Sequence, residues 1–167
     1  MNIGPIRILG VDPGLRSTGW GLIEAAGSRL NFLACGSIQT GAATSLADRL
    51  ASIHSSLTAL VDENAPHEAA VEETFVNRDP QSTLKLGQAR GAALAALALK
   101  NLPVSEYAAN LIKKTVVGVG HAEKSQVAMM VKMLLPASDA SSPDAADALA
   151  VAICHAQHRR ARARGAA

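Results

Sequence analysis

Four acidic residues stand where an apolar segment ends or a helix begins. Asp12 follows the run ILGV and precedes a Pro-Gly turn, and Glu72 closes a short apolar segment. Asp144 and Asp147 are three residues apart, so on a helix they share one face, with β-carbons roughly 5–6 Å apart. Clustered carboxylates are unfavourable unless a cation binds them. Oxygen ligands suit Mg²⁺ or Mn²⁺, and two such ions about 3.5–4 Å apart can promote phosphodiester hydrolysis.

Each acid also has an ordinary structural explanation. Asp12 is a common turn residue, and Glu72 suits an exposed strand end. Asp144 is favoured near a helix N-terminus by the macrodipole. Asp147 lies a full turn further into an otherwise apolar helix, where that effect fades. Histidines are few and carboxylates dominate the spacing, which argues against zinc.

Hydrophobic periodicity predicts the elements that must position these acids. Runs of apolar and β-branched residues predict strands, and apolar residues at helical spacing predict helices. The short link at 26–28 favours antiparallel pairing of the strands on either side. The order βββαβαβαα(α) predicts an α/β fold, a mixed five-stranded sheet flanked by helices. The strands are expected at 6–12, 17–26, 29–40, 68–73 and 103–108, and the helices at 45–63, 81–100, 108–116, 122–134 and 143–160.

This topology brings the acids to one edge of the sheet. The strand after the first helix is expected to return beside the first strand and parallel to it. Asp12 and Glu72 would then emerge together at the carboxyl edge, where open α/β sheets bind ligands. Ser142 and Pro143 suit the start of the last helix, which places Asp144 in its first turn. The turn after Asp12 leaves its carboxylate exposed at that edge.

Length and composition are typical of one folded domain. The chain has 167 residues, 49% of them apolar, which suits a sizeable core and excludes a disordered protein. We expect a single domain over residues 1–160 and a basic, disordered tail at 161–167. The longest apolar stretch, 91–99, is too short to span a membrane. Cys35 and Cys154 have no metal or disulfide spacing and no signal peptide is visible, so we expect a cytoplasmic protein with both cysteines in its core.

Basic residues are segregated along the chain although the formal net charge is only +2. Residues 77–132 contain eight Lys or Arg and three acids, and Arg159, Arg160, Arg162 and Arg164 follow near the C-terminus. Such segregation fits a phosphate-rich partner on one face of the molecule. A solvated surface is the ordinary alternative.

Five segments, taken together and in order, resemble one known family. They are GVDPGLRSTGWG, AVEETF, LKLGQARG, YAANLIKKTVVGVGHAEKSQV and DAADALAVAICH. The chain is similar over residues 8–155 to the RuvC Holliday junction resolvases, nucleases with an RNase H-like fold. The resemblance implies a metal-dependent, homodimeric endodeoxyribonuclease. Such an enzyme cuts four-way DNA junctions symmetrically in homologous recombination and repair.

The resemblance also implies an active site. The four catalytic acids of the family match Asp12, Glu72, Asp144 and Asp147, which would bind two Mg²⁺ ions, with Mn²⁺ as a substitute. Some members have His at the last of these positions, so the Asp here changes the charge of one ligand. By strand alternation Glu73 should point away from Glu72, and a register slip of one residue would exchange their roles.

Other residues match basic or aromatic positions of the family. Lys113 and Lys124 are expected near the active site, where they would hold the phosphate or stabilise developing negative charge. Phe75 would stack on an unpaired base, a contact worth about 1–3 kcal/mol, unless it is a core residue. Arg78, Lys85 and Lys114 are expected to contact the DNA backbone.

Symmetric cutting requires two equivalent sites, which a two-fold dimer provides. The helix expected at 81–100 allows close helix approach, and it either forms part of the dimer interface or packs on the sheet. Its small residues are Gly87, Ala89, Gly91, Ala92, Ala93, Ala95 and Ala96. A branch-migration complex of RuvA and RuvB is implied as a partner by the resemblance alone.

Three other functions fit parts of the sequence. ATP-binding domains of the actin and hexokinase type also begin with a strand, an Asp and a Gly-rich turn, but they need two domains around the nucleotide. GVGHAEKS lacks the spacing of a dinucleotide-binding loop and is expected to be a loop before a helix. A non-catalytic DNA-binding module of the same fold differs from the enzyme only in lacking metal-dependent cutting.

Overall fold

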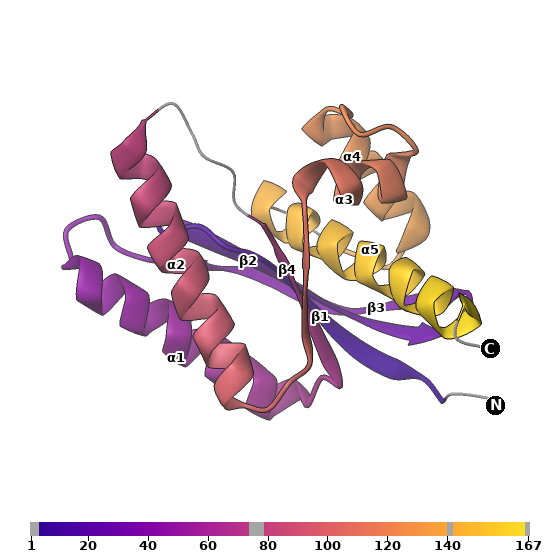
Figure 1. Ribbon diagram of the computed structural model, residues 1–167, viewed down its shortest axis with the longest axis horizontal. Helices are drawn as coiled ribbons and strands as arrows, with labels where there is room; N and C mark the ends of the chain where they lie inside the picture. Colours follow the sequence, from indigo (N-terminus) through magenta and orange to yellow (C-terminus); the bar gives the residue numbers. More distant parts are fainter. Residues whose placement is uncertain (1–3, 74–78, 140–141, 166–167) are drawn as a thin grey trace.

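The structure, a computed structural model, describes residues 4–73, 79–139 and 142–165 (Figure 1). Its elements follow the predicted order, and their boundaries agree closely with the prediction except at the end of the last helix. The strands are β1 (Ile6–Asp12), β2 (Ser17–Ala26), β3 (Arg29–Gln39), β4 (Glu68–Glu72) and β5 (Val104–Tyr107). The helices are α1 (Leu46–Asn64), α2 (Pro80–Leu99), α3 (Ala109–Val117), α4 (Lys124–Leu134) and α5 (Pro143–Gly165).

The strands form one mixed sheet in the order β3-β2-β1-β4-β5. The first three strands are antiparallel neighbours. Gly27, with a φ of 59°, lies in the tight turn between β2 and β3. After α1 the chain returns to place β4 parallel to β1, and β5 then pairs parallel to β4. The predicted mixed, five-stranded sheet is therefore confirmed, with β1 at its centre and β4 beside it.

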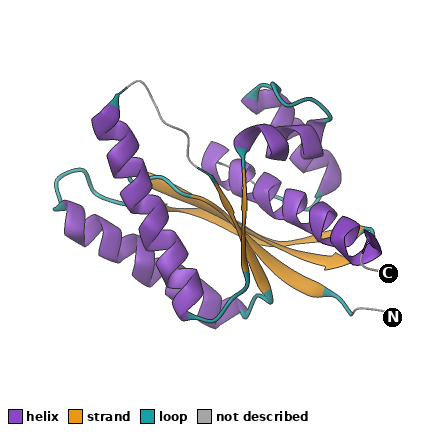
Figure 2. Cartoon of the chain, viewed as in Figure 1, coloured by secondary structure: helices purple, strands orange, loops and turns teal. Residues whose placement is uncertain are grey.

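Helices cover both faces of the sheet (Figures 1 and 2). α1 and α2 pack on one face, and α3, α4 and α5 lie on the other. Alternation along β1 divides its side chains between the layers, because Leu9 and Val11 belong to the core under α1 and α2 while Ile8 belongs to the core under α5. On α1 the buried stripe is Ile53 and Leu57, one turn apart.

Glycines let α5 lie directly on the strand backbones. A β-carbon added to Gly10 would overlap the backbone of Ala148 in α5, and one added to Gly21 would overlap Leu149. Gly10 and Gly21 are paired in the β1–β2 register, so the missing side chains leave a continuous furrow. Glycine inside a strand commonly marks such a close approach. The helix that carries two of the predicted acids is therefore seated against backbone atoms.

Capping explains where the helices begin. The hydroxyl of Ser45 accepts a hydrogen bond at the start of α1, and Asp79 caps α2 with Pro80 as its first residue. At the other end of the chain, α5 continues to Gly165. The tail expected to be disordered from residue 161 is thus helical up to that point, and the alternating Ala and Arg there are both strong helix formers.

The cysteines differ from each other in their surroundings. Cys154 is a buried core residue of α5, as expected, and its thiol donates to Thr115 (3.6 Å). Cys35 is only partly buried on β3 and faces the carboxylate of Asp139 at 3.7 Å, so it lies at the margin of the core. Across the described part of the chain, no helix has the length and apolar character needed to cross a lipid bilayer.

Candidate active site

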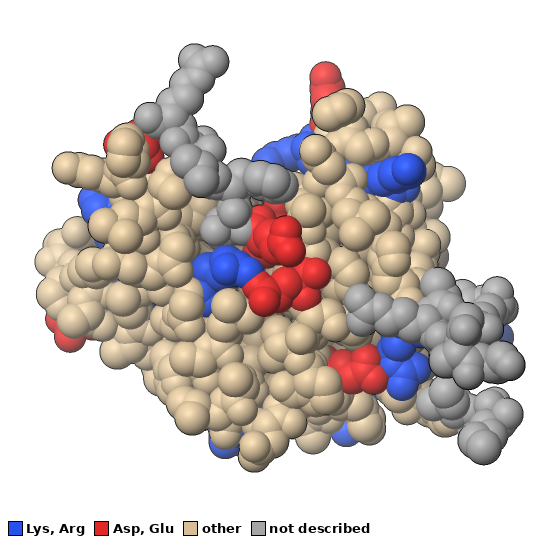
Figure 3. Space-filling model, viewed as in Figure 1, with Lys and Arg blue, Asp and Glu red and all other residues tan. Residues whose placement is uncertain are grey.

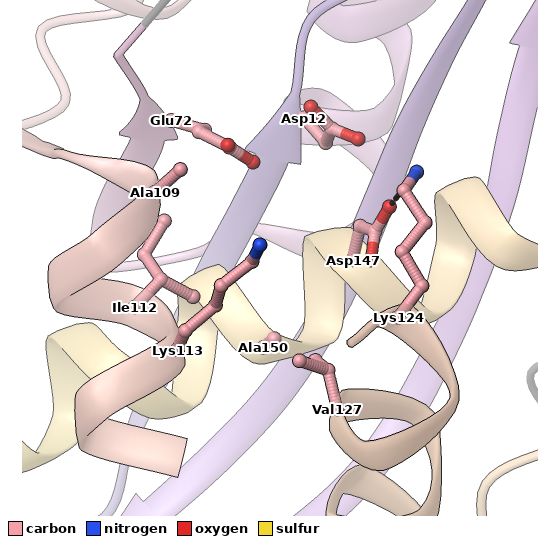
Figure 4. Close-up of a pocket in the computed structure, with 9 residues that line it drawn as sticks. All are labelled: Asp12, Glu72, Ala109, Ile112, Lys113, Lys124, Val127, Asp147 and Ala150. Atoms are coloured by element: carbon pink, nitrogen blue, oxygen red, sulfur yellow. Dashed lines mark hydrogen bonds and ion pairs between the residues drawn. The ribbon is translucent and has the colours of Figure 1, made fainter. Parts of the chain in front are cut away.

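A pocket of about 210 Å³ opens where the two central strands end. In the parallel register Val11 pairs with Val71, so the residues that follow, Asp12 and Glu72, emerge side by side. Figure 4 shows these two carboxylates with an acid of α5 and two lysines, all turned toward one another. The residues lining the pocket are Asp12, Glu72, Ala109, Ile112, Lys113, Lys124, Val127, Asp147 and Ala150.

Both acids of α5 reach this edge of the sheet. Asp147 lines the pocket, and its carboxylate accepts a hydrogen bond from the ammonium group of Lys124 at 3.0 Å. Asp144 lies one turn earlier, with its backbone over Gly19, where an added β-carbon would overlap the Asp144 carbonyl oxygen. Gly19 is the partner of Asp12 in the β1–β2 register, so the missing side chain brings Asp144 next to Asp12. The four predicted acids therefore gather at one place.

Crowding and burial change the protonation of the strand acids. The pKa of Asp12 is raised to about 8, first by burial and then by the charges of Glu72 and Asp147. Burial and Asp147 likewise raise the pKa of Glu72, against opposing contributions from a hydrogen bond with Asp12 and from both lysines. Without metal, the two acids titrate as a coupled pair, and burial and crowding favour retention of a proton by that pair.

Two lysines approach the acids from the helical side. Lys124 is the first residue of α4, and its hydrogen bond and charge interaction with Asp147 raise the pKa of its ammonium group. Lys113 lies on α3 next to Ile112, and both side chains line the pocket (Figure 4). Both lysines thus lie where they were expected.

The donor set suits a hydrated divalent cation. In the ranges that the structure describes, no three Asp, Glu, His or Cys side chains are placed so that they alone could hold a metal ion. Mg²⁺ does not need such a cage, because one or two carboxylates usually bind it together with water and substrate phosphates. Three carboxylates, those of Asp12, Glu72 and Asp147, line the pocket against the ammonium groups of Lys113 and Lys124. A divalent cation would supply the missing positive charge.

The other predicted residues divide into three groups. Lys85 on α2 and Lys114 on α3 are exposed and do not line the pocket. Phe75 and Arg78 lie outside the described residues. Glu73 is exposed, so Glu72 is the member of the Glu-Glu pair that the strand directs into the pocket.

The surface around the site carries charge of both signs. Figure 3 shows acidic side chains in the hollow between the two helical layers, with basic side chains beside them.

The GVGHAEKS segment lies nearby as the link from α3 to α4, and Gly118 ends α3 with a φ of 98°. Because the segment follows a helix, it is not a dinucleotide-binding turn. It is a loop before a helix, as expected.

Helix α2 uses its small residues on two sides. Ala89, Ala93 and Ala96 are fully buried against α1 and the sheet, which confirms that the helix packs within the molecule. A β-carbon added to Gly87 or Gly91 would meet nothing within 4 Å. The outer side is therefore also open to close approach.

Sequence reasoning missed two polar networks that hold α5. Near the pocket, the hydroxyl of Ser17 donates to Asp144 (2.5 Å). Farther along α5, Glu68 accepts hydrogen bonds from His155 (2.7 Å) and Arg159 (2.6 Å), and the other ring nitrogen of His155 lies 2.9 Å from the Tyr107 hydroxyl. The one signal for the first network was that Ser17 shares a strand face with the glycines. The signal for the second was His155 in the apolar run AVAICH.

Fold and site together define a class of enzyme. A mixed sheet in this strand order, with carboxylates at the ends of its central strands and on the last helix, is that of a nuclease with an RNase H-like fold. The sequence profile of the crossover junction endodeoxyribonuclease RuvC matches residues 8–155. The chain belongs to this family, which is one of metal-dependent nucleases.

Individual relatives agree with this assignment. The crossover junction endodeoxyribonuclease RuvC of Methylocella silvestris is 68% identical over 98% of this chain and 93% of the relative, and that of Beijerinckia indica is 65% identical over 93% and 89%. The solved structure of Thermus thermophilus RuvC in complex with a Holliday junction substrate has a TM-score of 0.87 at 32% identity, covering 94% of this chain and 96% of that one. The yeast mitochondrial Holliday junction resolvase, at 13% identity and a TM-score of 0.64, shares the fold.

Proposed function

We propose that this protein is a structure-selective endonuclease that resolves four-way DNA junctions by paired, symmetric phosphodiester hydrolysis in recombination and repair. The observation that carries the proposal is the parallel β1–β4 register, which sets Asp12 and Glu72 beside Asp147 and two lysines in one pocket. Family membership and the likeness to a relative solved with a Holliday junction support the choice of substrate.

Four carboxylates would hold the metal, Mg²⁺ with Mn²⁺ as a substitute and two ions in each site. They are Asp12, Glu72, Asp144 and Asp147. When bound, such ions supply an activated water and neutralise charge on the leaving oxygen. In the metal-free protein the pKa of Asp12 is raised to about 8, so metal binding must displace a proton from the two strand acids. The affinity for the metal is therefore expected to increase as the pH rises toward 8.

The lysines have separate tasks in this proposal. Lys124 pairs with Asp147 and fixes that carboxylate on its helix. Lys113 is close enough to lower the pKa of Glu72, yet it remains directed into the pocket, where its ammonium group would contact the scissile phosphate. Outside the pocket, we assign contacts with the DNA backbone to Lys85 and Lys114, and to Arg78, with Phe75 stacking on an unpaired base.

A homodimer is part of the same proposal, because two symmetric cuts need two sites. The outer side of α2 suits the interface, since Gly87 and Gly91 leave room for a second backbone, and Leu84 and Leu99 are 64% and 72% exposed. Analytical ultracentrifugation is expected to show a dimer at micromolar concentration and a monomer for Leu84→Arg. A wild-type monomer would contradict this part of the proposal.

Two further elements rest on family membership alone. We propose that the protein acts in the cytoplasm with the branch-migration complex of RuvA and RuvB. Assembly of all three proteins on a junction is expected to be visible by co-sedimentation. If the protein is excluded from junctions that carry RuvA and RuvB, this partnership is wrong.

A cleavage assay tests the central proposal. A synthetic four-way junction and a linear duplex of the same sequence are incubated with Mg²⁺, Mn²⁺ or EDTA. Wild type is expected to make paired symmetric nicks only in the junction and only with metal. Asp12→Asn and Glu72→Gln are expected to bind the junction and leave it uncut, because binding depends on basic groups and shape.

Glu73→Gln is the matched control for this assay. It removes the adjacent carboxylate, which is exposed and does not line the pocket, so cutting is expected to continue. Junction binding without cutting under any metal would identify the protein as a non-catalytic binding module. Equal nicking of the linear duplex would contradict selectivity for junctions.

A further inference from the structure

A chain of two hydrogen bonds crosses three elements beside the candidate active site. The side-chain amide of Gln39 on β3 donates to the hydroxyl of Ser17 on β2 at 2.8 Å. That hydroxyl donates to Oδ2 of Asp144 on α5 at 2.5 Å. Ser17 and Asp144 are 127 residues apart in the sequence. The contact therefore exists only because the last helix lies on the second strand.

The chemistry of the three groups determines which of them donates in each of the two hydrogen bonds. An amide nitrogen only donates, so the bond from Gln39 uses an acceptor site of the Ser17 oxygen. The single hydroxyl hydrogen of Ser17 remains for Asp144, whose ionised carboxylate only accepts. Gln39 thus aims the Ser17 hydrogen at Asp144. Hydrogen bonds to a charged acceptor are roughly twice as strong as neutral ones.

Strand register places these groups on one face of the sheet. Ser17 pairs with Gln39 between β2 and β3, and side chains two residues apart on a strand share a face. Ser17 and Gly19 are therefore both turned toward α5, and the missing side chain of Gly19 lets the backbone of Asp144 come down beside Ser17. Gly19 leaves room for the backbone of α5, and Ser17 forms a hydrogen bond with Asp144, the first acid of that helix.

The two acids of α5 are held in chemically different ways. Asp147 faces the ammonium group of Lys124, which offsets its charge. Asp144 is held by a neutral hydroxyl, which orients the carboxylate without a cation in hydrogen-bond contact with it among the described residues. Its Oδ1 accepts no hydrogen bond from the described residues, whereas Oδ2 is turned to β2. This arrangement suits a carboxylate that is fixed through one oxygen and can bind a metal ion through the other.

We propose that Ser17, aimed by Gln39, is a positioning residue that fixes the Asp144 carboxylate for binding of the divalent metal. The proposal rests on the metal-ligand role given to Asp144 under the proposed function. Groups that hold a metal ligand in place commonly change metal affinity about 10–100-fold when removed. Ser17 and Gln39 are thus assigned to metal affinity, with no direct contact to the reacting atoms.

The test measures Mn²⁺ binding to the full protein without DNA, by electron paramagnetic resonance of free Mn²⁺ and by calorimetry. Ser17→Ala is expected to raise the Mn²⁺ dissociation constant about 10-fold or more. Ser17→Thr keeps the hydroxyl and is expected to restore most of the affinity. Gln39→Met removes only the group that aims Ser17, so an intermediate loss is expected. The junction-cutting rate of Ser17→Ala is expected to recover at high Mg²⁺.

Ser37→Ala is the matched control. The Ser37 hydroxyl also accepts a hydrogen bond from Gln39, at 3.0 Å, but it forms no hydrogen bond with Asp144 in the described structure. Its removal should leave Mn²⁺ affinity unchanged. A loss in Ser37→Ala equal to that in Ser17→Ala would show a general disturbance of the sheet and overturn the proposal.

Asp144→Asn separates this proposal from the one on which it rests. If Asp144→Asn loses Mn²⁺ affinity and Ser17→Ala does not, the positioning role alone is wrong. If Asp144→Asn binds Mn²⁺ as well as wild type does, the ligand role of Asp144 fails, and the positioning role fails with it. Ser17→Ala should add no further loss in the Asp144→Asn background, because its effect passes through that carboxylate.

Discussion

The two faces of the sheet are built by different packing rules. Under α1 and α2, side chains such as Leu9 and Leu57 pack in one core, and Gly36 on β3 makes room there for the Trp20 side chain, not for a helix backbone. Under α5, Gly10, Gly19 and Gly21 remove the strand side chains, and the helix rests on backbone atoms. Successive residues of β1 supply both arrangements, because neighbours along a strand point to opposite faces.

This difference shows where positional precision is concentrated. Interdigitated side chains relax when one is shortened, whereas a backbone contact cannot move without moving the whole element. Asp144 and Asp147 depend on the seat of α5, so the site inherits the rigidity of that face. The α1–α2 face carries none of the four predicted site acids. Substitutions on the two faces are therefore expected to have different consequences.

The largest effect is expected for Gly19→Ala, on the α5 face. The added methyl group would overlap the Asp144 carbonyl oxygen, so the N-terminal turn of α5 must move. Displacing catalytic groups by about 1 Å can lower a rate about 100-fold, and we expect at least that loss in junction cutting. Single-turnover cleavage measures it. In Gly41→Ala an added β-carbon meets only Thr44, at 3.7 Å or more, so near-normal cutting is expected there.

Leu57→Ala should lower stability and leave the cutting rate unchanged, which is the opposite of the effect expected for Gly19→Ala. Leu57 is a fully buried residue of α1, and such truncations lower the free energy of unfolding by about 2–5 kcal/mol. The cutting rate of the folded protein should stay near that of wild type. Urea denaturation and cleavage at low temperature measure the two quantities. A large loss of rate in protein shown to be folded would mean that the two faces are not independent.

A smaller effect is expected from the protonation of Asp12. Its pKa of about 8 in the folded protein lies above the ordinary value of 3.8, so the native state binds the proton more tightly than the unfolded chain does. The resulting stabilisation is complete below the unfolded pKa and is lost as the pH rises through the folded pKa. The melting temperature of metal-free protein should therefore fall by several degrees between pH 5.5 and 8.5.

Asp12→Asn provides the comparison for this pH dependence. The amide cannot ionise, so the variant should show a flatter profile and be no less stable than wild type at pH 8. Mg²⁺ should remove the fall in the melting temperature of wild type at high pH, because it binds the ionised acids. A variant that melts clearly lower than wild type at pH 8 would show that Asp12 is a structural residue of the turn.

The smallest effect is expected at the surface of the α1–α2 face. Lys100, which directly follows α2, contacts Asp62 on α1 at 2.5 Å, but the Asp62 side chain is 57% exposed. Such pairs contribute about 0.2–1 kcal/mol, so Asp62→Asn should barely change the urea midpoint. Glu68→Gln, which disturbs the more enclosed contacts with His155 and Arg159, should cost more. Equal losses would remove this contrast between the faces.

The sequence contained enough to predict the sheet and the acid cluster. Alternating apolar runs and helical spacing are local properties, and the carboxyl-edge rule then brought Asp12 and Glu72 together. The contacts of Ser17 with Asp144 and of Glu68 with His155 could not be predicted in the same way. Both join residues far apart in the sequence, and they depend on which strand lies under α5 and in which register.

The order in which the elements are synthesised has a consequence for a nuclease. α5 is the last of the described elements to leave the ribosome, and it supplies Asp144, Asp147 and much of one core. A nascent chain that has already made β1 and β4 still lacks half of its acids and the helix that seats them. If these acids act as proposed, cutting activity is expected to appear only after α5 has packed on the sheet, so a partly synthesised chain would not cut DNA.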